Sequence, residues 1–320
     1  MGRSRPVEHD TYIQAQMLTA QLRAACPPKL RGSLVRYLAG EISSEMTLMQ
    51  FALLLGGAGT LNAVLQNLVT AAPLASGVAD LARLAAANSG HLEQLTALAE
   101  RELVDIPRAQ SDGIAAIRNQ FDRAVTVAPE ASVALYSLGS ANILARATGE
   151  VVSRLNEWHL LRPELRVLDI GCGIGRFELA LAPHVGAMTA IDISAAMVEE
   201  ARRRCRDLAN VIFEQCNGRD LAAFGGRSFD LVLAIDTFPY LFAADPAIVS
   251  LHVRDVARCL QPGGNFVIIN FSYRGDDAAD RLDIEQLASA NGFSVVRAGT
   301  RDFSLWDGLT FLLTLPAPRE

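Results

Sequence analysis

The sequence predicts an α/β fold for the second half of the chain and an all-helical first part. From about residue 160, short β-branched runs alternate with helical segments, which is typical of a parallel sheet with crossover helices. Before about residue 130, apolar residues recur at helical spacing and no β-rich run occurs. A chain of 320 residues is also long for one domain. We therefore expect a helical N-terminal domain at 1–133 and a sheet domain at 134–320.

Proline and serine residues divide the first part into helices. Pro27 and Pro28 separate a predicted helix at Tyr12–Ala25 from one at Leu30–Leu38, since proline ends a helix. Ser43 precedes the next apolar helical run and is a suitable N-cap.

One stretch, Met46–Ala79, contains no charged residue and requires a membrane check. Glycines at 56, 57 and 59 and several amides interrupt it, whereas a spanning helix needs about 20 apolar residues in one run. Two buried helices joined at the glycines explain this composition better than a membrane span.

Seven strands and four helices are predicted in the second half, after a helix at 141–159. The strands are Arg166–Ile170, Ala187–Ile191, Val211–Gln215, Leu231–Ile235, Asn265–Asn270, Ser294–Ala298 and Thr310–Thr314. The helices between them are Arg176–Ala182, Ala195–Asp207, Ile248–Cys259 and Ile284–Asn291.

A glycine-rich turn follows the first of these strands. Gly171, Gly173 and Gly175, with Cys172 between them, let the backbone turn sharply and approach a ligand before a helix begins. Nicotinamide and flavin enzymes use a similar turn, but with the spacing G-x-G-x-x-G. Here the spacing is G-x-G-x-G, and Asp169 stands where a pyrophosphate would be a poor neighbour.

Asp192 ends the second strand, one helix beyond the glycine turn. A carboxylate at this place is able to accept hydrogen bonds from both hydroxyls of a ribose. The alternative is a surface aspartate that caps the helix starting at Ser194. The glycine turn favours the ribose interpretation.

At this point the sequence resembles the class I, Rossmann-like S-adenosylmethionine-dependent methyltransferases. The resemblance covers about residues 135–320 and rests on four blocks in register: VLDIGCGIGR at 167–176, AIDIS at 190–194, SFDLVLA at 228–234 and LQPGGNFV at 260–267. It implies a seven-stranded, mostly parallel sheet whose last strand is antiparallel. It also implies S-adenosyl-L-methionine as cofactor, with S-adenosyl-L-homocysteine as product, the methionine part at Gly171–Gly175, and the ribose at Asp192 beside Ile193.

The resemblance also points to residues near the adenine and the pocket entrance. Family members often carry an aspartate after the third strand that contacts the adenine amino group. Here Asn217 stands at that position, followed by Gly218, and either Asn217 or Asp220 makes the contact. Tyr136 matches a residue that helps to close the pocket before the first strand.

The acceptor is expected at the carboxyl ends of the fourth and fifth strands, where open α/β sheets form their crevice. Asp236 is the candidate catalytic base, or alternatively a cap for the following turn, and Tyr240 is its neighbour. The fifth strand leads into Asn270, Tyr273 and Arg274.

Arg274 is able to bind a substrate carboxylate or phosphate. Alternatively it forms a salt bridge with Asp276 or Asp277.

Composition limits the partners. The net charge of -6 argues against binding to nucleic acid or anionic membranes, and the arginines at 202–206 fit the solvated face of a helix. Five scattered cysteines without a C-x-x-C pair favour a reducing cytoplasm over a disulfide framework. No histidine stands at metal-ligand spacing from a carboxylate, so no metal is expected. His252 is a surface or helical histidine close to the crevice.

The sequence therefore predicts a methyltransferase that acts on a small-molecule metabolite. The alternatives are a cofactor-binding scaffold or regulatory protein without methyl transfer, and a protein methyltransferase. The N-terminal helices are expected to cover the crevice, to form a homodimer, or both.

Overall fold

The computed structural model describes residues 21–98 and 112–317. The predicted helix at Tyr12–Ala25 lies largely outside these residues. In the described part, every element before the sheet is helical, as predicted. These elements are η1 (Pro28–Leu30), α2 (Arg31–Leu38), α3 (Ser44–Leu55), α4 (Ala58–Ala71), α5 (Ser76–Ala87), α6 (Ser89–Leu98), α7 (Gly113–Val127), α8 (Pro129–Val133), η3 (Leu135–Ser137) and α9 (Ala141–Glu157).

The uncharged stretch forms α3, α4 and the start of α5, rather than one long helix. The chain turns at Gly56, whose φ of 70° is in the left-handed region that glycine adopts without strain. Phe51, Leu61 and Leu68 are fully buried in the core of this helical cluster. Within the described ranges, no helix is both long and apolar enough to cross a membrane.

The second half forms the predicted seven-stranded sheet. The strand order is β3-β2-β1-β4-β5-β7-β6, and β7 runs antiparallel to both of its neighbours. All seven predicted strands are present, several with longer ends. They are β1 (Arg166–Ile170), β2 (Ala187–Asp192), β3 (Val211–Gln215), β4 (Phe229–Ile235), β5 (Leu260–Ile269), β6 (Ser294–Arg301) and β7 (Leu309–Thr314).

The two faces of the sheet carry separate cores. Along β4, Leu231 and Leu233 point to one core while Val232 and Ala234 point to the other. This alternation follows from the two-residue period of a strand. Because both faces are covered, the strands are almost continuously apolar, as expected for parallel sheets.

Two helices of the sheet domain differ most from the prediction, and the helix predicted at Ala195–Asp207 ends three residues earlier, at Arg204. α14 begins at Asp277, seven residues before the predicted start, because the Asp276 side chain accepts a hydrogen bond from the Ala279 amide. α12 was not predicted, and it begins directly after β4 with Pro239 in its first turn. The set is α10 (Arg176–Leu181), η4 (Ala182–His184), α11 (Ala195–Arg204), α12 (Phe238–Ala244), α13 (Pro246–Cys259) and α14 (Asp277–Ala290).

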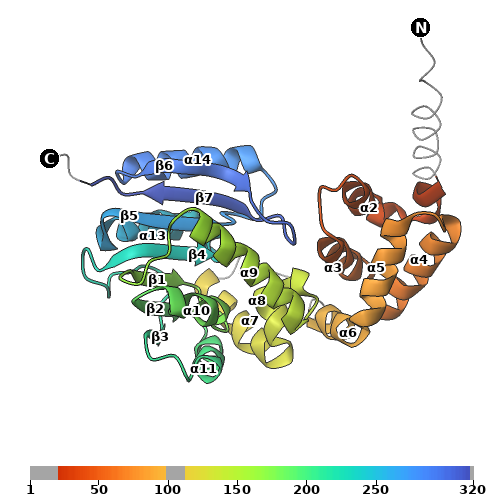
Figure 1. Ribbon diagram of the computed structural model, residues 1–320, viewed down its shortest axis with the longest axis horizontal. Helices are drawn as coiled ribbons and strands as arrows, with labels where there is room; N and C mark the ends of the chain where they lie inside the picture. The colour runs from red at the N-terminus through yellow and green to blue at the C-terminus, as the bar shows by residue number, and fades with distance from the viewer. Residues whose placement is uncertain (1–20, 99–111, 318–320) are drawn as a thin grey trace, which may run out of the picture.

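The N-terminal helices divide into two groups in space. Figure 1 shows α2–α6 gathered at one side of the molecule, with α7–α9 between them and the sheet. α7 contacts both α11 and α12, so it belongs by its packing to the sheet domain. The start of α3 contacts the C-terminal part of the chain through Ser43, whose hydroxyl donates a 2.6 Å hydrogen bond to the Leu305 carbonyl. Glu45 pairs with Arg146 of α9 at 3.3 Å.

Replacing Ser43 with alanine should lower the free energy of unfolding by about 1–2 kcal/mol. The hydroxyl both accepts from the Met46 amide, which caps α3, and donates to Leu305. Urea unfolding followed by circular dichroism measures the change. Ser44→Ala is the matched control, because the Ser44 hydroxyl bonds only to the adjacent Glu45 carboxylate. Equal effects of the two substitutions would contradict the role of Ser43.

Candidate functional site

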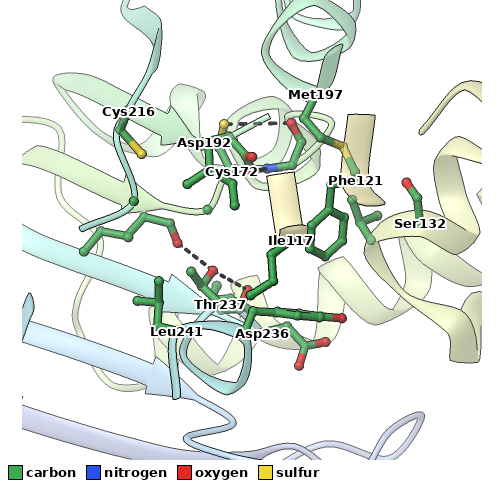
Figure 2. Close-up of a pocket in the computed structure, with 18 of the residues that line it drawn as sticks. Ile117, Phe121, Ser132, Cys172, Asp192, Met197, Cys216, Asp236, Thr237 and Leu241 are labelled. Atoms are coloured by element: carbon green, nitrogen blue, oxygen red, sulfur yellow. Dashed lines mark hydrogen bonds between the residues drawn. The ribbon is translucent and has the colours of Figure 1, made fainter. Parts of the chain in front are cut away.

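A cavity lies at the carboxyl ends of the central strands. Its walls come from the glycine turn after β1, the end of β2, the segment after β3, and the end of β4. α7 and α8 supply a fifth wall. Figure 2 shows Ile117 and Phe121 of α7 between the Asp192 side and the Asp236 side of this cavity. The position is the one that open α/β sheets use for ligands.

The glycine turn is packed too closely for side chains. Gly171 and Gly173 both have positive φ, of 83° and 54°. A Cβ atom on Gly171 would lie 2.1 Å from Thr237 Oγ1, and one on Gly173 would lie 2.7 Å from Val133 Cγ1. Glycine is thus required for both the backbone conformation and the close contacts. Gly175, also with positive φ, caps α10.

Asp192 lies at the end of β2 and lines the cavity. Its Oδ2 accepts a 2.9 Å hydrogen bond from the Gly173 amide, and its Oδ1 accepts one of 2.9 Å from the Ser194 amide. Burial raises the pKa of Asp192 to about 6, and the two amides oppose that shift. Each carboxylate oxygen has room for a further donor, because a carboxylate offers about four acceptor positions.

Ser194 is the N-cap of α11, which was the role considered for Asp192 as an alternative. Asp192 therefore holds the start of this helix through a backbone amide and also faces the cavity. The interpretation of Asp192 as a surface helix cap is wrong, because the residue is 8% exposed and Ser194 is the N-cap. The ribose contact of Asp192 stays a prediction.

Asp169 lies behind the glycine turn and does not line the cavity. It is buried beside Glu178 of α10, and burial raises the pKa of both carboxyl groups. Among the described residues, Asp169 Oδ2 and both Glu178 oxygens have no hydrogen-bond partner. Burial of two neighbouring carboxyl groups disfavours a charge on both, so the raised pKa of each favours a protonated form.

The segment after β3 contributes Cys216 and Gly218 to the cavity wall, but not Asn217. The side-chain oxygen of Asn217, Oδ1, accepts hydrogen bonds from the backbone amides of Arg219 and Asp220. Its side-chain nitrogen, Nδ2, donates to the Asp220 carboxylate. These bonds form a local turn at the surface. The side chains of Asn217 and Asp220 are therefore occupied by each other and by the backbone, and a contact of either with adenine stays a prediction.

Asp236 lies at the end of β4 with a left-handed φ of 61°, and Asn270 at the end of β5 has a φ of 62°. The Asn270 amide group donates to Asp236 Oδ1 at 2.9 Å, and the Tyr273 hydroxyl donates to the same oxygen. Burial raises the pKa of Asp236, and these two donors oppose the shift. Left-handed backbone in a non-glycine residue costs free energy and is found preferentially at functional sites.

Tyr240 lines the cavity and packs edge-to-face against Phe121 and Tyr273. Tyr136 lies outside the lining residues; its ring stacks on Trp306, and its hydroxyl accepts a 3.3 Å hydrogen bond from Arg176. Asn270 and Tyr273 do not line the cavity; both contact the lining residue Asp236, and Tyr273 also contacts Tyr240.

Arg274 pairs with Asp280 and Asp283, each at 2.7 Å, and its guanidinium lies over the ring of Phe242. This is the salt-bridge alternative, with Asp280 and Asp283 in place of Asp276 and Asp277. Because its donors are used in these contacts and it does not line the cavity, Arg274 is not proposed further as a substrate ligand.

Several lining residues were not assigned to the site from the sequence. Ile114, Ile117 and Phe121 stand at i, i+3 and i+7 of α7, a spacing that signals one helical face but not what the face covers. Arg176 follows the glycine turn directly, which is the signal that could have found it. His252 was noted only as a weak candidate, yet it lines the cavity and is 2% exposed.

Comparison with known proteins agrees with the sheet fold and with the resemblance of the sequence to methyltransferases. Residues 167–264 match the family described as a methyltransferase domain. An S-adenosyl-L-methionine-dependent Diels-Alderase of Talaromyces variabilis is 30% identical over 146 residues, which are 43% of this chain and 48% of that protein. A demethylmenaquinone methyltransferase of Tropheryma whipplei is 36% identical over 107 residues, 33% of this chain and 42% of that protein. The chain thus spans less than half the length of these two relatives.

Among solved structures, the phosphoethanolamine N-methyltransferase 1 of Haemonchus contortus, in complex with phosphoethanolamine and S-adenosylhomocysteine, has a TM-score of 0.51 and 17% sequence identity. The similarity covers 65% of this chain and 50% of that one. At this identity the likeness concerns the fold.

Asp192 should make the protein less stable as the pH rises from about 4 to about 7. Its folded pKa of about 6 exceeds the ordinary 3.8, so the folded state binds more protons than the unfolded state between these values. Stability from the protonated carboxyl is complete below the unfolded pKa and is lost as the pH passes the folded one. The free energy of unfolding, relative to Asp192→Asn, should fall by up to about 3 kcal/mol across this window.

Urea unfolding of both proteins at several pH values measures this difference. Parallel pH curves for wild type and Asp192→Asn would contradict the assigned shift.

Proposed function

We propose that the protein, whose residues 167–264 match a methyltransferase domain family, transfers a methyl group from S-adenosyl-L-methionine to a small-molecule acceptor. The observation that carries the proposal is the glycine turn, whose Gly173 amide is hydrogen-bonded to the cavity-lining carboxylate Asp192. The cofactor, when bound, supplies an electrophilic methyl group and leaves as S-adenosyl-L-homocysteine.

The residues present fit this cofactor. The closely packed glycines leave backbone as the wall against the methionine part, and Arg176, the one arginine or lysine among the described lining residues, would neutralise its carboxylate. Asp192, with Ile193 beside it, would accept from the ribose hydroxyls. Gly218 and the apolar side chains around it would enclose the base.

The acceptor is proposed to be small and largely apolar. α7 presents Ile117 and Phe121 to the cavity, and β4 and α12 present Ile235, Tyr240 and Leu241. Such a lining favours burial of an apolar body. A protein substrate would need an open surface at this place, whereas α7 and α8 cover it.

Asp236 is the proposed proton acceptor for a hydroxyl or amine nucleophile. Asn270 and Tyr273 both donate to its Oδ1, which orients the carboxylate and leaves Oδ2 for the acceptor. The raised pKa brings the carboxyl closer to neutral pH, where a general base is most effective. Most of the rate would come from alignment of the two reactants.

The helices α7 and α8 are proposed as the cover of the site, and the helices α2–α6 as a separate N-terminal module that is available for a homodimer contact. Asp122 of α7 ties the cover down, because its Oδ1 accepts from the Ser194 hydroxyl at 2.6 Å and from the Ala196 amide at 3.2 Å. A domain boundary between α6 and α7 agrees with this packing better than the predicted one at 133.

The reducing cytoplasm also stays a proposal, supported by five free thiols.

Two measurements test the proposed function. Isothermal titration calorimetry with S-adenosyl-L-homocysteine tests cofactor binding, and release of tritiated methyl groups to a panel of apolar phenols, quinols and amines tests transfer. Absence of binding would end the proposal. Binding without transfer to any acceptor would favour the scaffold alternative, or another reaction such as that named for the Talaromyces relative.

Asp236→Asn should lower kcat about 100-fold with an acceptor that must lose a proton. Asparagine keeps the size of the side chain but is a far weaker base. Rates with saturating cofactor and acceptor measure the change, and Asp245→Asn, an exposed helix cap after α12, is the control. Unchanged kcat would remove Asp236 from the proton transfer.

Asp122→Ala should raise the dissociation constant for S-adenosyl-L-homocysteine about tenfold, because it removes a charged hydrogen bond that holds the cover. Calorimetry measures the constant. Asp207→Ala just beyond α11, where the side chain is 86% exposed, should have no effect. Equal affinities of wild type and Asp122→Ala would show that the cover does not depend on this contact.

A further inference from the structure

His252 lies in α13 with its imidazole enclosed in the protein. It is 2% exposed, packs edge-to-face against Phe238, and lines the cavity. Its Nδ1 lies 2.9 Å from the Ile248 carbonyl oxygen of the same helix. A carbonyl only accepts hydrogen bonds, so Nδ1 carries the proton.

The tautomer leaves Nε2 as an acceptor. Burial lowers the pKa of His252, so the ring is neutral at physiological pH and Nε2 keeps its lone pair. No described residue donates to Nε2, and it is not among the fully enclosed polar atoms that lack a partner. Among the described residues Nε2 therefore has no donor and is not fully enclosed, and the residue that carries it lines the cavity.

α13 is hydrogen-bonded to the segment that follows β3. The Asp255 carboxylate, one turn after His252, accepts a 3.0 Å hydrogen bond from the Leu221 amide. Cys216 and Gly218 of the same segment line the cavity together with His252 and Leu241. This part of the wall is apolar apart from the imidazole, because Asn217 is occupied in its surface turn.

We propose that His252 accepts a hydrogen bond from the exocyclic amine of the cofactor's adenine. This inference rests on the proposed function, which puts the methionine part at the glycine turn and the ribose at Asp192. The base then continues toward the segment after β3, where His252 is the acceptor that faces the cavity. A neutral imidazole nitrogen matches an amine donor and opposes a carbonyl oxygen at the same position.

The assignment makes His252 a binding and specificity residue for the base. An adenine amine left unpaired against an apolar wall loses a hydrogen bond, which reduces affinity about three- to tenfold. A hypoxanthine base carries an oxygen in place of the amine, and that oxygen would face the Nε2 lone pair. Discrimination between the two bases should therefore depend on His252.

The experiment is calorimetric titration of wild type, His252→Leu and His252→Gln with S-adenosyl-L-homocysteine and S-inosyl-L-homocysteine. Wild type should bind the inosyl compound at least about tenfold more weakly than the adenosyl compound, because a buried acceptor then faces an acceptor. His252→Leu should bind the adenosyl compound about three- to tenfold more weakly than wild type, with the discrimination reduced to about threefold or less. Glutamine keeps both an acceptor and a donor. His252→Gln should therefore bind each compound with an affinity between that of wild type and that of His252→Leu. His91→Leu, at an exposed position of α6, is the control.

The outcomes separate this inference from the proposed function. If wild type binds neither compound, the proposed function fails. If wild type binds the adenosyl compound but His252→Leu binds and discriminates as wild type does, the role of His252 is overturned while the cofactor site stands. Thermal unfolding by circular dichroism checks that each variant is folded. Loss of affinity for both compounds by the same factor would also overturn the role, because it would indicate a packing effect alone.

Discussion

The hydrogen bond from the Gly173 amide to the Asp192 carboxylate fixes the relation between the first two strands at the point where they end. The same carboxylate accepts from the Ser194 amide, which begins α11. The Ser194 hydroxyl continues the chain of contacts to Asp122 in α7. One polar network thus joins the glycine turn, the second strand and the helical cover, so that the shape of the cavity depends on it.

This network exists at a cost, because the site buries several carboxylates. Burial raises the pKa of Asp169, Glu178, Asp192 and Asp236 alike. Ionised carboxylates are expensive to bury unless donors or cations compensate them. Backbone amides compensate Asp192, and the side chains of Asn270 and Tyr273 compensate Asp236. Asp169 and Glu178 have no such donors, so their raised pKa favours protonation.

The helices of the first part contribute to the site unequally. α7 and α8 supply lining residues and pack on the sheet domain, so the pocket is assembled from segments on both sides of the predicted boundary. α3 has a different position: Ser43, at its start, bonds to the Leu305 carbonyl, and its buried residues share one core with α4–α6 and with Ala124, Ala128 and Ala131 of the α7–α8 region. The N-terminal helices therefore support the cover through a common core.

Local patterns in the sequence determine the sheet and the glycine turn. Strand positions follow from β-branched runs, and the glycine turn, Asp192 and Asp236 follow from their places at strand ends, because parallel strands bring their carboxyl ends to one edge. These are local patterns, and they were readable without knowing which surfaces meet.

Only the tertiary structure decided which side chains complete the site. Phe121 and His252 reach the cavity through the packing of whole helices, which no local spacing encodes. Asn217 and Arg274 stand where the sequence suggested ligands, but nearby donors and carboxylates occupy them. For a polar side chain, the choice between a ligand and a protein partner depends on distances that exist only after folding.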